Sequence, residues 1–442
     1  MDNQTLNENL KICIIGAGIG GLTCAIACRQ QGLSVKVLEQ APEILPIGAG
    51  IQIPPNASRV LESLGILPSI RHVACEMKTI KLRRYENGAL LTSKPIKHQT
   101  PWFVIHRADY HKILLNRAKE LGVHVLLGSK VDRIDFNTGE AYLDQAVVVK
   151  SDVIIGADGL WSTTRESMLG RSSAPVETGD LAYRATFTRE QLEGLDEPRI
   201  TELCNEPGVT AWLGPGKHCV LYQVQGGEQI NMVLIRPDDL ASGVRTEQGD
   251  IGEMKQTFED WDGVLTKIIS CIPTVLKWKL MHHGELDRWV KGCVALLGDA
   301  CHPTLPYQAQ GAAMAVEDGA IIGQLLGRLN QNLRDGNINR HNLQGRITSV
   351  LQLYEHCQKK RTTINVQGAL NNRHFYHMSD GEEQRLRDHL LAHHTWTDEK
   401  SVYKWCDMSY SEELLDANVL ENAEKTFDDW VSTQWTKTRH SL

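Results

Sequence analysis

The feature that most restricts the fold of this chain is a glycine-rich turn near its N-terminus. The glycines are Gly16, Gly18 and Gly21, and they lie between the apolar run 12–15 and the small and apolar run 22–28. Glycines in this spacing allow a tight strand-to-helix turn. They also let the backbone approach a pyrophosphate, whose negative charge the helix N-terminus favours. The pattern predicts a strand followed by a helix, with a phosphate-binding turn between them.

A second apolar run supports this prediction. Residues 35–38 are apolar or alternate with a lysine, and they end in Glu39. An acid at this place accepts hydrogen bonds from ribose hydroxyls, and it favours a free 2′-hydroxyl over a 2′-phosphate. The N-terminal segment is therefore predicted to be a strand–helix–strand unit that binds a dinucleotide of the NAD or FAD type.

A matching turn occurs almost a whole chain away. The apolar run 294–297 leads into Gly298 and Asp299, Pro306 stiffens the following segment, and a helix pattern opens at Gly311 and Ala312. An NAD dehydrogenase does not return to its nucleotide with a late glycine–aspartate turn. A carboxylate that accepts hydrogen bonds from a ribityl chain implies a flavin, and the positive end of a helix at 311–312 would favour a reduced, anionic flavin ring. Two distant half-sites thus predict one long ligand, FAD.

A third turn of the same type lies between these two in the sequence. The strand-like run 154–157 ends in Asp158 and Gly159. With these three motifs in this order, the chain resembles the single-component FAD-dependent aromatic hydroxylases, which have the para-hydroxybenzoate hydroxylase fold. It is most similar to salicylate hydroxylase-like enzymes and to fungal phenol hydroxylases of polyketide pathways. The resemblance covers roughly residues 10–380, and Ala313 departs from it because many relatives carry asparagine there.

The resemblance implies an α/β chain, α+β overall, in which a Rossmann-like FAD-binding domain is interleaved with a second, mainly antiparallel sheet. Alternating segments such as 219–224 and 230–235 independently predict antiparallel strands. The expected division is 10–75 and 104–181 for the FAD-binding domain, with 76–103 as an excursion toward the substrate layer, 182–284 for the substrate sheet, 285–340 for the return to the FAD-binding domain, and 341–442 for a helical C-terminal region.

The resemblance also implies roles for particular residues. Arg107 is expected to reach the FAD phosphate or ribityl region, the Pro306 carbonyl is expected near the reactive flavin carbon, and Ala49 or Gly50 is expected to let the backbone approach the flavin ring. The full set expected to bind the cofactor is Gly16, Gly18, Gly21, Glu39, Ala49, Gly50, Arg107, Asp158, Asp299, Pro306, Gly311 and Ala312.

Two residues of the predicted sheet are candidates for the catalytic handling of substrate. Arg184 and Tyr222 match the arginine and tyrosine that hold a phenolate in the fungal enzymes, and an arginine offers a charged planar fork to such an oxygen. The alternatives are a surface arginine and a packed aromatic side chain. His218 precedes Tyr222 by four residues, hence on the same strand face, and is a candidate for the pocket wall.

The implied reaction consumes NADPH or NADH, which binds transiently because the chain has one dinucleotide fingerprint, together with dioxygen and a small phenolic substrate. Oxygen would reach the ring from a flavin hydroperoxide in a pocket that excludes water. The phenol could be a salicylate-type acid or a larger alkylated resorcinol. The sequence leaves open whether the substrate also loses a carboxylate or its aromaticity in the reaction. The alternatives are a flavin oxidase or reductase that never forms the peroxide, and a non-catalytic FAD- or NAD-binding sensor.

Composition narrows the remaining classes. The net charge of −7 argues against a nucleic-acid partner, and no apolar run reaches the roughly 18 to 20 residues that span a bilayer. Eleven cysteines without metal-type spacing predict free thiols in a reducing, cytoplasmic compartment, with no bound metal, and Cys24 and Cys28 are expected to pack in the core. The basic run 359–361 is expected to form a solvated helix face, and a homodimer stays open.

Overall fold

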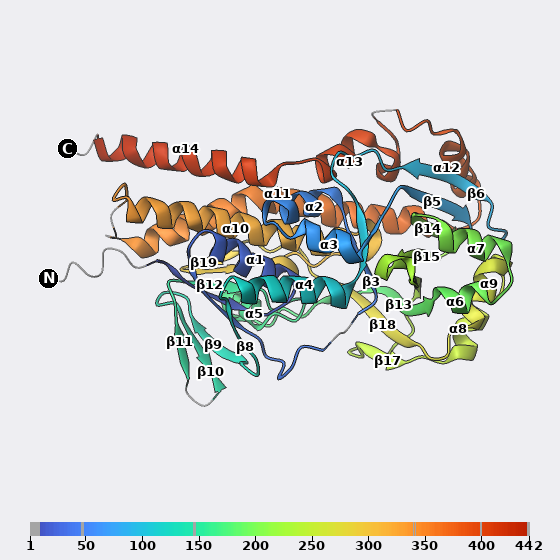
Figure 1. Ribbon diagram of the computed structural model, residues 1–442, viewed down its shortest axis with the longest axis horizontal. Coiled ribbons are helices and arrows are strands. Elements are labelled where there is room, and N and C mark those ends of the chain that lie inside the picture. The colour runs from blue at the N-terminus through green and yellow to red at the C-terminus, as the bar shows by residue number, and fades with distance from the viewer. Residues whose placement is uncertain are drawn as a thin grey trace.

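The structure, a computed structural model, describes residues 9–45, 48–144, 147–338, 340, 342–397 and 400–439. Two large sheets lie toward opposite ends of the molecule, and long helices connect them (Figure 1). The expected α/β class with a second antiparallel sheet and a helical C-terminal region is confirmed. The division into six segments stays a prediction.

A six-stranded sheet contains the N-terminal strand–helix–strand unit. Its strands are parallel except for the pair β19–β20 at one edge. In spatial order they are β19 (Val290–Lys291), β20 (Val294–Leu296), β12 (Val153–Gly156), β1 (Lys11–Ile15), β2 (Ser34–Leu38) and β8 (His124–Leu126). The three glycine or glycine–aspartate turns follow β1, β12 and β20, which are neighbours. Because carboxyl ends of parallel strands meet at one edge, the sheet brings the three turns together.

The glycines of the first turn are required by close backbone contacts. Gly16 has φ +106°, and a Cβ atom there would lie 2.4 Å from the Ala157 carbonyl oxygen of the neighbouring turn. A Cβ on Gly21 would lie 2.1 Å from the Gly16 carbonyl oxygen. Larger residues would force the turns apart.

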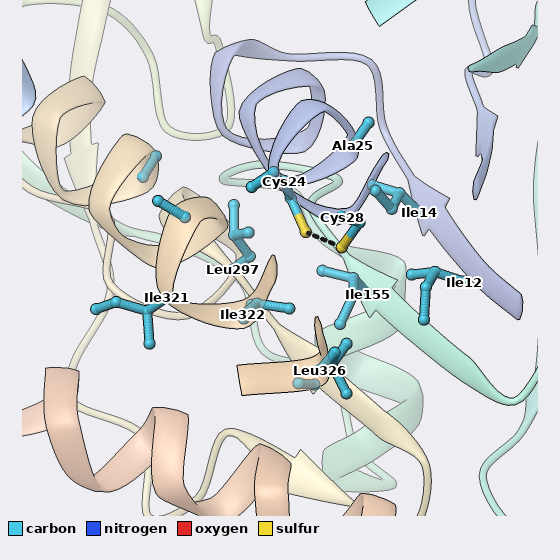
Figure 2. Packing of buried hydrophobic residues seen from close by; sticks show 14 of the residues in the cluster. Ile12, Ile14, Cys24, Ala25, Cys28, Ile155, Leu297, Ile321, Ile322 and Leu326 are labelled. Carbon is cyan, nitrogen blue, oxygen red and sulfur yellow. Dashed lines mark hydrogen bonds between the residues drawn. The ribbon is translucent and has the colours of Figure 1, made fainter. Parts of the chain in front are cut away.

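Helices cover the six-stranded sheet and pack closely on one another. Helix α1 (Ile19–Gln30) crosses α10 (Gly311–Arg334), and a Cβ on Gly319 would lie 2.7 Å from the Cys24 amide nitrogen. Figure 2 shows Cys24 and Cys28 of α1 among buried isoleucines and leucines, some of which belong to α10. The two cysteine sulfurs lie 4.0 Å apart. The expected core packing of these cysteines is confirmed.

Two three-stranded sheets flank this region. One contains β9 (Val131–Asp135), β10 (Glu140–Leu143) and β11 (Val148–Lys150), and the other β3 (Gly50–Ile53), β7 (Phe103–His106) and β4 (Cys75–Glu76). The helices near them are α2 (Pro55–Ser63), α3 (Leu67–Val73), α4 (Arg107–Glu120) and α5 (Thr163–Leu169).

An eight-stranded sheet forms the other end of the molecule. Its spatial order is β17 (Thr246–Gln248), β18 (Leu276–His282), β13 (Val176–Thr188), β16 (Gln229–Pro237), β15 (Lys217–Val224), β14 (Gly208–Gly214), β5 (Thr79–Arg84) and β6 (Leu90–Pro95). All its pairs are antiparallel except β5–β14. One face packs on a cluster of α6 (Arg189–Glu193), α7 (Pro198–Asn205), α8 (Ile251–Thr257) and α9 (Gly263–Ser270). The opposite face is free to line cavities.

The C-terminal region consists of α11 (Leu343–Tyr376), α12 (Glu382–His393), α13 (Met408–Leu415) and α14 (Val419–Arg439). Helices α10, α11 and α14 lie side by side (Figure 1). Four short 3-10 turns lie elsewhere among the described residues: η3 (Gln225–Gly227), η4 (Gly298–Ala300), η5 (Pro306–Gln308) and η6 (Lys404–Cys406). Among the described residues, no helix combines the length and apolar character that a bilayer crossing needs.

The expectation of a solvated face at 359–361 is wrong for Arg361. Its guanidinium donates to both carboxylate oxygens of Glu317, at 2.8 and 2.9 Å, and also to the carbonyl oxygens of Glu413 and Leu414. Glu317 is fully buried on α10. Helix α11 therefore turns this arginine inward, because a buried carboxylate on the neighbouring helix needs a charged partner.

Candidate active site

Two adjoining cavities lie at the turns of the six-stranded sheet, and the larger one also faces the open side of the eight-stranded sheet. The larger, which we call the central cavity, has a volume of about 430 Å³. The smaller, the N-terminal cavity, has about 240 Å³ and shares Gly18, Ala157 and Gly159 with it. Such an elongated space, polar at the turns and apolar at the sheet, suits a long ligand.

The structure brings together nearly all residues singled out from the sequence. The central cavity is lined by Gly18, Gly21, Gly50, Arg107, Arg184, Tyr222, Asp299, Pro306, Gly311 and Ala312. The N-terminal cavity is lined by Gly16, Gly18, Glu39 and Asp158. Ala49 is the exception: it does not line either cavity, and its carbonyl oxygen accepts a hydrogen bond from the Arg107 amide at 3.0 Å.

Two helix N-termini open onto the central cavity without a side chain capping them. Gly18 is the N-cap of α1 and Gln310 the N-cap of α10, and neither makes a side-chain cap hydrogen bond. A Cβ on Gly18 or on Gly159 would meet no atom within 4 Å. Backbone N–H groups, positive helix ends and free space next to glycine together form a cradle for an anionic group such as a pyrophosphate.

Glu39 is held in place by one backbone amide of the first glycine turn and one of its own turn. Its Oε2 accepts from the Ala17 amide at 2.8 Å, and its Oε1 from the Ala41 amide at 2.9 Å. Each carboxylate oxygen keeps a further lone pair, so Glu39 can still accept from sugar hydroxyls in the N-terminal cavity.

Asp158 supports the middle turn from within. Its carboxylate accepts from the Ser162 hydroxyl at 2.6 Å and from the amide and hydroxyl of Thr164, both at 3.0 Å. These contacts hold the start of α5. A contribution of Asp158 to cofactor binding would therefore act mainly through the shape of the turn.

The charged groups of the central cavity perturb one another. Burial raises the pKa of Asp299, while His302 and Arg107 act in the opposite direction. Burial also lowers the pKa of Arg107, and the like charge of Arg184 adds to this effect. Two arginines and one aspartate in one cavity leave an excess of positive charge, which favours an anionic ligand.

A buried polar group that the sequence did not indicate supports the Asp299 turn. Asp318 on α10 accepts from the Gly298 amide at 2.9 Å, from His302 at 2.6 Å and from the Gln358 side chain at 2.9 Å. Cys301, His302 and Asp318 have potential metal-ligating atoms within 4.8 Å of one another. Because Asp318 is already engaged three times and burial raises the pKa of the Cys301 thiol, this cluster suits a support for the turn better than a cation site.

Gly50 brings the small sheet into contact with Tyr222. A Cβ at position 50 would lie 2.4 Å from a ring carbon of Tyr222 and 2.9 Å from Asn231. Asn231 is fully buried, and its side-chain oxygen accepts from the Gly50 amide at 2.8 Å. Sequence reasoning missed Asn231; a lone amide inside the apolar run 230–235 was the available signal. We infer that Gly50 is needed for the approach of Tyr222 as well as for any ligand.

A smaller cavity adjoins the central one on the far side of Pro306. This side cavity has a volume of about 130 Å³ and shares Gln52, His218, Val220, Pro306 and Ala309 with the central cavity. Its other walls include residues of β5, β6, β14, α11 and the C-terminal region 404–415. The sequence did not indicate that this C-terminal segment contributes to a cavity.

His218 lines the central and the side cavity, as its strand position suggested. It also has a partner that the sequence did not reveal. Its Nδ1 lies 2.7 Å from Nε2 of His377, at the end of α11. Burial, with a smaller effect of the neighbouring imidazole, lowers the pKa of His218 well below its usual value, and burial lowers the pKa of His377 to about 4.

This pair predicts a loss of stability in mild acid. The unfolded chain binds protons at these histidines below a pH of about 6.5, whereas the folded protein keeps them neutral to a lower pH. From pH 7.5 to pH 5, we expect the pair to lower the free energy of unfolding by about 2 kcal/mol, discounted for the partial exposure of His377. Urea denaturation at both pH values measures this change. His377→Gln should reduce the pH dependence and His72→Gln, at an exposed histidine, should not; equal slopes in all three proteins would contradict the prediction.

Comparison with known proteins gives a consistent result. Residues 9–335 match the family model described as an FAD binding domain. The FAD-dependent monooxygenase OpS4 of Beauveria bassiana (strain ARSEF 2860) is 36% identical over 412 residues, which are 91% of this chain and 93% of that protein. The 3-hydroxybenzoate 6-hydroxylase of Polaromonas naphthalenivorans (strain CJ2) is 33% identical over 391 residues, covering 86% of this chain and 92% of that protein.

Solved structures share the fold. A salicylate hydroxylase in a substrate complex superposes with a TM-score of 0.76 at 21% identity, covering 95% of this chain and 98% of that one. Klebsiella pneumoniae HpxO, in complex with FAD and uric acid, gives a TM-score of 0.76 at 22% identity, with coverage of 95% and 100%.

Proposed function

This chain belongs to the FAD-binding-domain family, and on that premise we propose that it is an FAD-dependent monooxygenase that hydroxylates a small phenolic substrate at the expense of NADH or NADPH. One observation carries the proposal. The two uncapped helix N-termini, Asp299 and the pair Arg184 and Tyr222 all face a single cavity of about 430 Å³. Groups suited to bind a nucleotide and a cation suited to bind a phenolic oxygen thus line the same cavity, as a reaction between cofactor and substrate requires.

The residues present fit FAD. The turn at Gly16–Gly21 and the start of α1 would hold the pyrophosphate, Glu39 would accept from the adenosine ribose, and Asp299 would accept from the ribityl chain. The start of α10 at Gly311 would face the flavin ring. When bound, FAD supplies hydride acceptance from the nicotinamide and activation of dioxygen for transfer to an electron-rich ring carbon.

Arg184 and Tyr222 would bind and orient the phenol. Arg184 keeps its charge and would stabilise a phenolate, which raises the electron density of the ring. Burial raises the pKa of Tyr222 well above its usual value, so its hydroxyl stays protonated and donates. Both side chains lie on one sheet face, on β13 and β15, the two strands that flank β16, so the backbone of the sheet fixes their separation.

The apolar walls of the central cavity would exclude water from the reacting atoms. Ala182, Val220, Val233 and Ile235 line it from the sheet, and Leu297 and Leu305 line it from the opposite side. A dry environment strengthens the interaction of Arg184 with an anionic oxygen and suppresses the wasteful breakdown of activated oxygen.

The test begins with purified protein, which should be yellow and retain FAD. A panel of salicylates and alkylated resorcinols should include phenols that perturb the flavin absorbance and accelerate NADH or NADPH oxidation. With labelled dioxygen, one labelled oxygen atom should enter the product. Turnover without label in the product would replace the proposal by an oxidase or reductase, and FAD binding without any turnover would favour a sensor.

A further inference from the structure

The side cavity contains a cationic group that the proposed reaction does not use. Lys94, on the edge strand β6, lines this cavity opposite Ile80 of β5. Its ammonium lies 5.4 Å from the ring centre of Trp396 and 5.3 Å from that of Trp405. The ammonium also donates a long hydrogen bond, 3.5 Å, to the Trp405 carbonyl oxygen.

No carboxylate forms an ion pair with Lys94 within the part of the chain that the structure describes. The neighbouring Lys404 differs, since it pairs with Asp407 at 3.1 Å. Burial lowers the pKa of Lys94 to about 8, with the Cys406 thiol acting in the opposite direction, so the amine is still mostly protonated at neutral pH. A partly buried cation that has no counter-ion among the described residues is costly, and an anionic ligand would reduce that cost.

The path from the central cavity to Lys94 is mainly apolar. Ile80, Leu82, Val209 and Ala211 form its sheet side, and Leu414 and Leu415 of α13 form part of the opposite side. The path starts at His218, Val220 and Pro306, which also line the central cavity next to Arg184 and Tyr222. A ligand with its ring in the central cavity therefore has an apolar channel ahead of it that ends in a positive charge.

We propose that the side cavity is a second arm of the substrate site, and that the substrate is a phenol whose ring carries an apolar chain ending in a carboxylate that pairs with Lys94. This inference rests on the proposed function and narrows its substrate class. The apolar chain would gain from leaving water, and the carboxylate would form a charge-assisted hydrogen bond.

The test compares three ligands of the wild-type holoenzyme: resorcinol, 5-pentylresorcinol and 6-(3,5-dihydroxyphenyl)hexanoic acid. The matching salicylates replace them if the panel favours that ring. Dissociation constants are measured from the change in flavin absorbance. We expect the pentyl compound to bind about 10-fold more tightly than resorcinol, and the chain acid to bind about 10-fold more tightly again.

Variants then assign the effect to the arm. Lys94→Met should remove the 10-fold advantage of the chain acid and leave the other two ligands unchanged, whereas Lys97→Met, at an exposed lysine of the same segment, should change nothing. Ala211→Phe, which narrows the arm, should weaken both chain compounds and not resorcinol.

The outcomes separate the two proposals. If resorcinol binds and is turned over but the chain compounds bind no better, in wild type and in Lys94→Met alike, the arm is refuted and the monooxygenase stands. If no phenol perturbs the flavin, the proposed function fails first. The wild-type ligand series decides the matter even if a variant does not fold.

Discussion

Replacing Gly18 by aspartate is expected to abolish FAD retention in a protein that still folds. Gly18 is the N-cap of α1, and a Cβ there meets no atom within 4 Å. Aspartate is a slightly better N-cap residue than glycine and should raise the stability of the cofactor-free protein by about 0.3 kcal/mol. The same carboxylate would face the pyrophosphate, and two like charges about 4 Å apart repel by about 4 kcal/mol at a protein surface, which corresponds to about 1000-fold in affinity.

The opposite signs of these two effects make the prediction specific. Flavin absorbance after gel filtration and titration with FAD measure the binding, and thermal unfolding of the cofactor-free protein measures the stability. Gly284→Asp is a matched control, because a Cβ at Gly284 also meets no atom within 4 Å and Gly284 does not line the central or the N-terminal cavity. FAD retained by Gly18→Asp at wild-type affinity would show that the pyrophosphate does not bind at this turn.

Replacing Arg184 by alanine is expected to lower kcat/KM for the phenol by about 100-fold while FAD stays bound. Arg184 lines the central cavity from β13, on the same sheet face as Tyr222. A charged hydrogen bond to a phenolate in a mostly apolar cavity contributes about 3 kcal/mol. The loss should be largest for the more acidic phenols at a pH above their pKa in solution, where the phenol is ionised. A protonated phenol does not need the cation, so its turnover should fall less.

Steady-state kinetics with the best phenol of the panel measure this effect. Arg184→Lys keeps the charge but not the planar fork, so it should recover part of the activity. Arg171→Ala removes an exposed arginine outside the cavities and should behave as wild type. Unchanged turnover in Arg184→Ala would remove Arg184 from the substrate site, and loss of FAD in that variant would assign it to the cofactor instead.

Much of the cofactor site could be predicted because its signals are local. Gly16 has a positive φ, which favours glycine, and a ligand at the turn needs the free space beside Gly18. Both requirements are independent of the rest of the chain. Glu39 and Asp299 each follow an apolar strand, so their place at a sheet edge follows from their neighbours in sequence. The alternation of residues 219–224 likewise predicted an antiparallel strand.

The misses share a physical cause. Arg361 was expected to be solvated, the partner of His218 was not foreseen, and Lys94 was not singled out. Their environments depend on residues far away in the sequence: Glu317 on α10, His377 at the end of α11, and two tryptophans near the C-terminus. The buried amide of Asn231 depends on Gly50 in the same way. A polar side chain acquires its role from the partner that desolvates or neutralises it, and sequence spacing does not name that partner.

The sequence by itself determined the fold class, the three turns and the kind of ligand they suit, because backbone conformation and hydrophobic alternation are properties of short segments. Only the tertiary structure decided that these turns and Arg184 share one cavity, that a second cavity extends from it to Lys94, and which charges are paired. Cavities are the space left between elements packed from distant parts of the chain, so their shape and electrostatics exist only once the whole chain has folded.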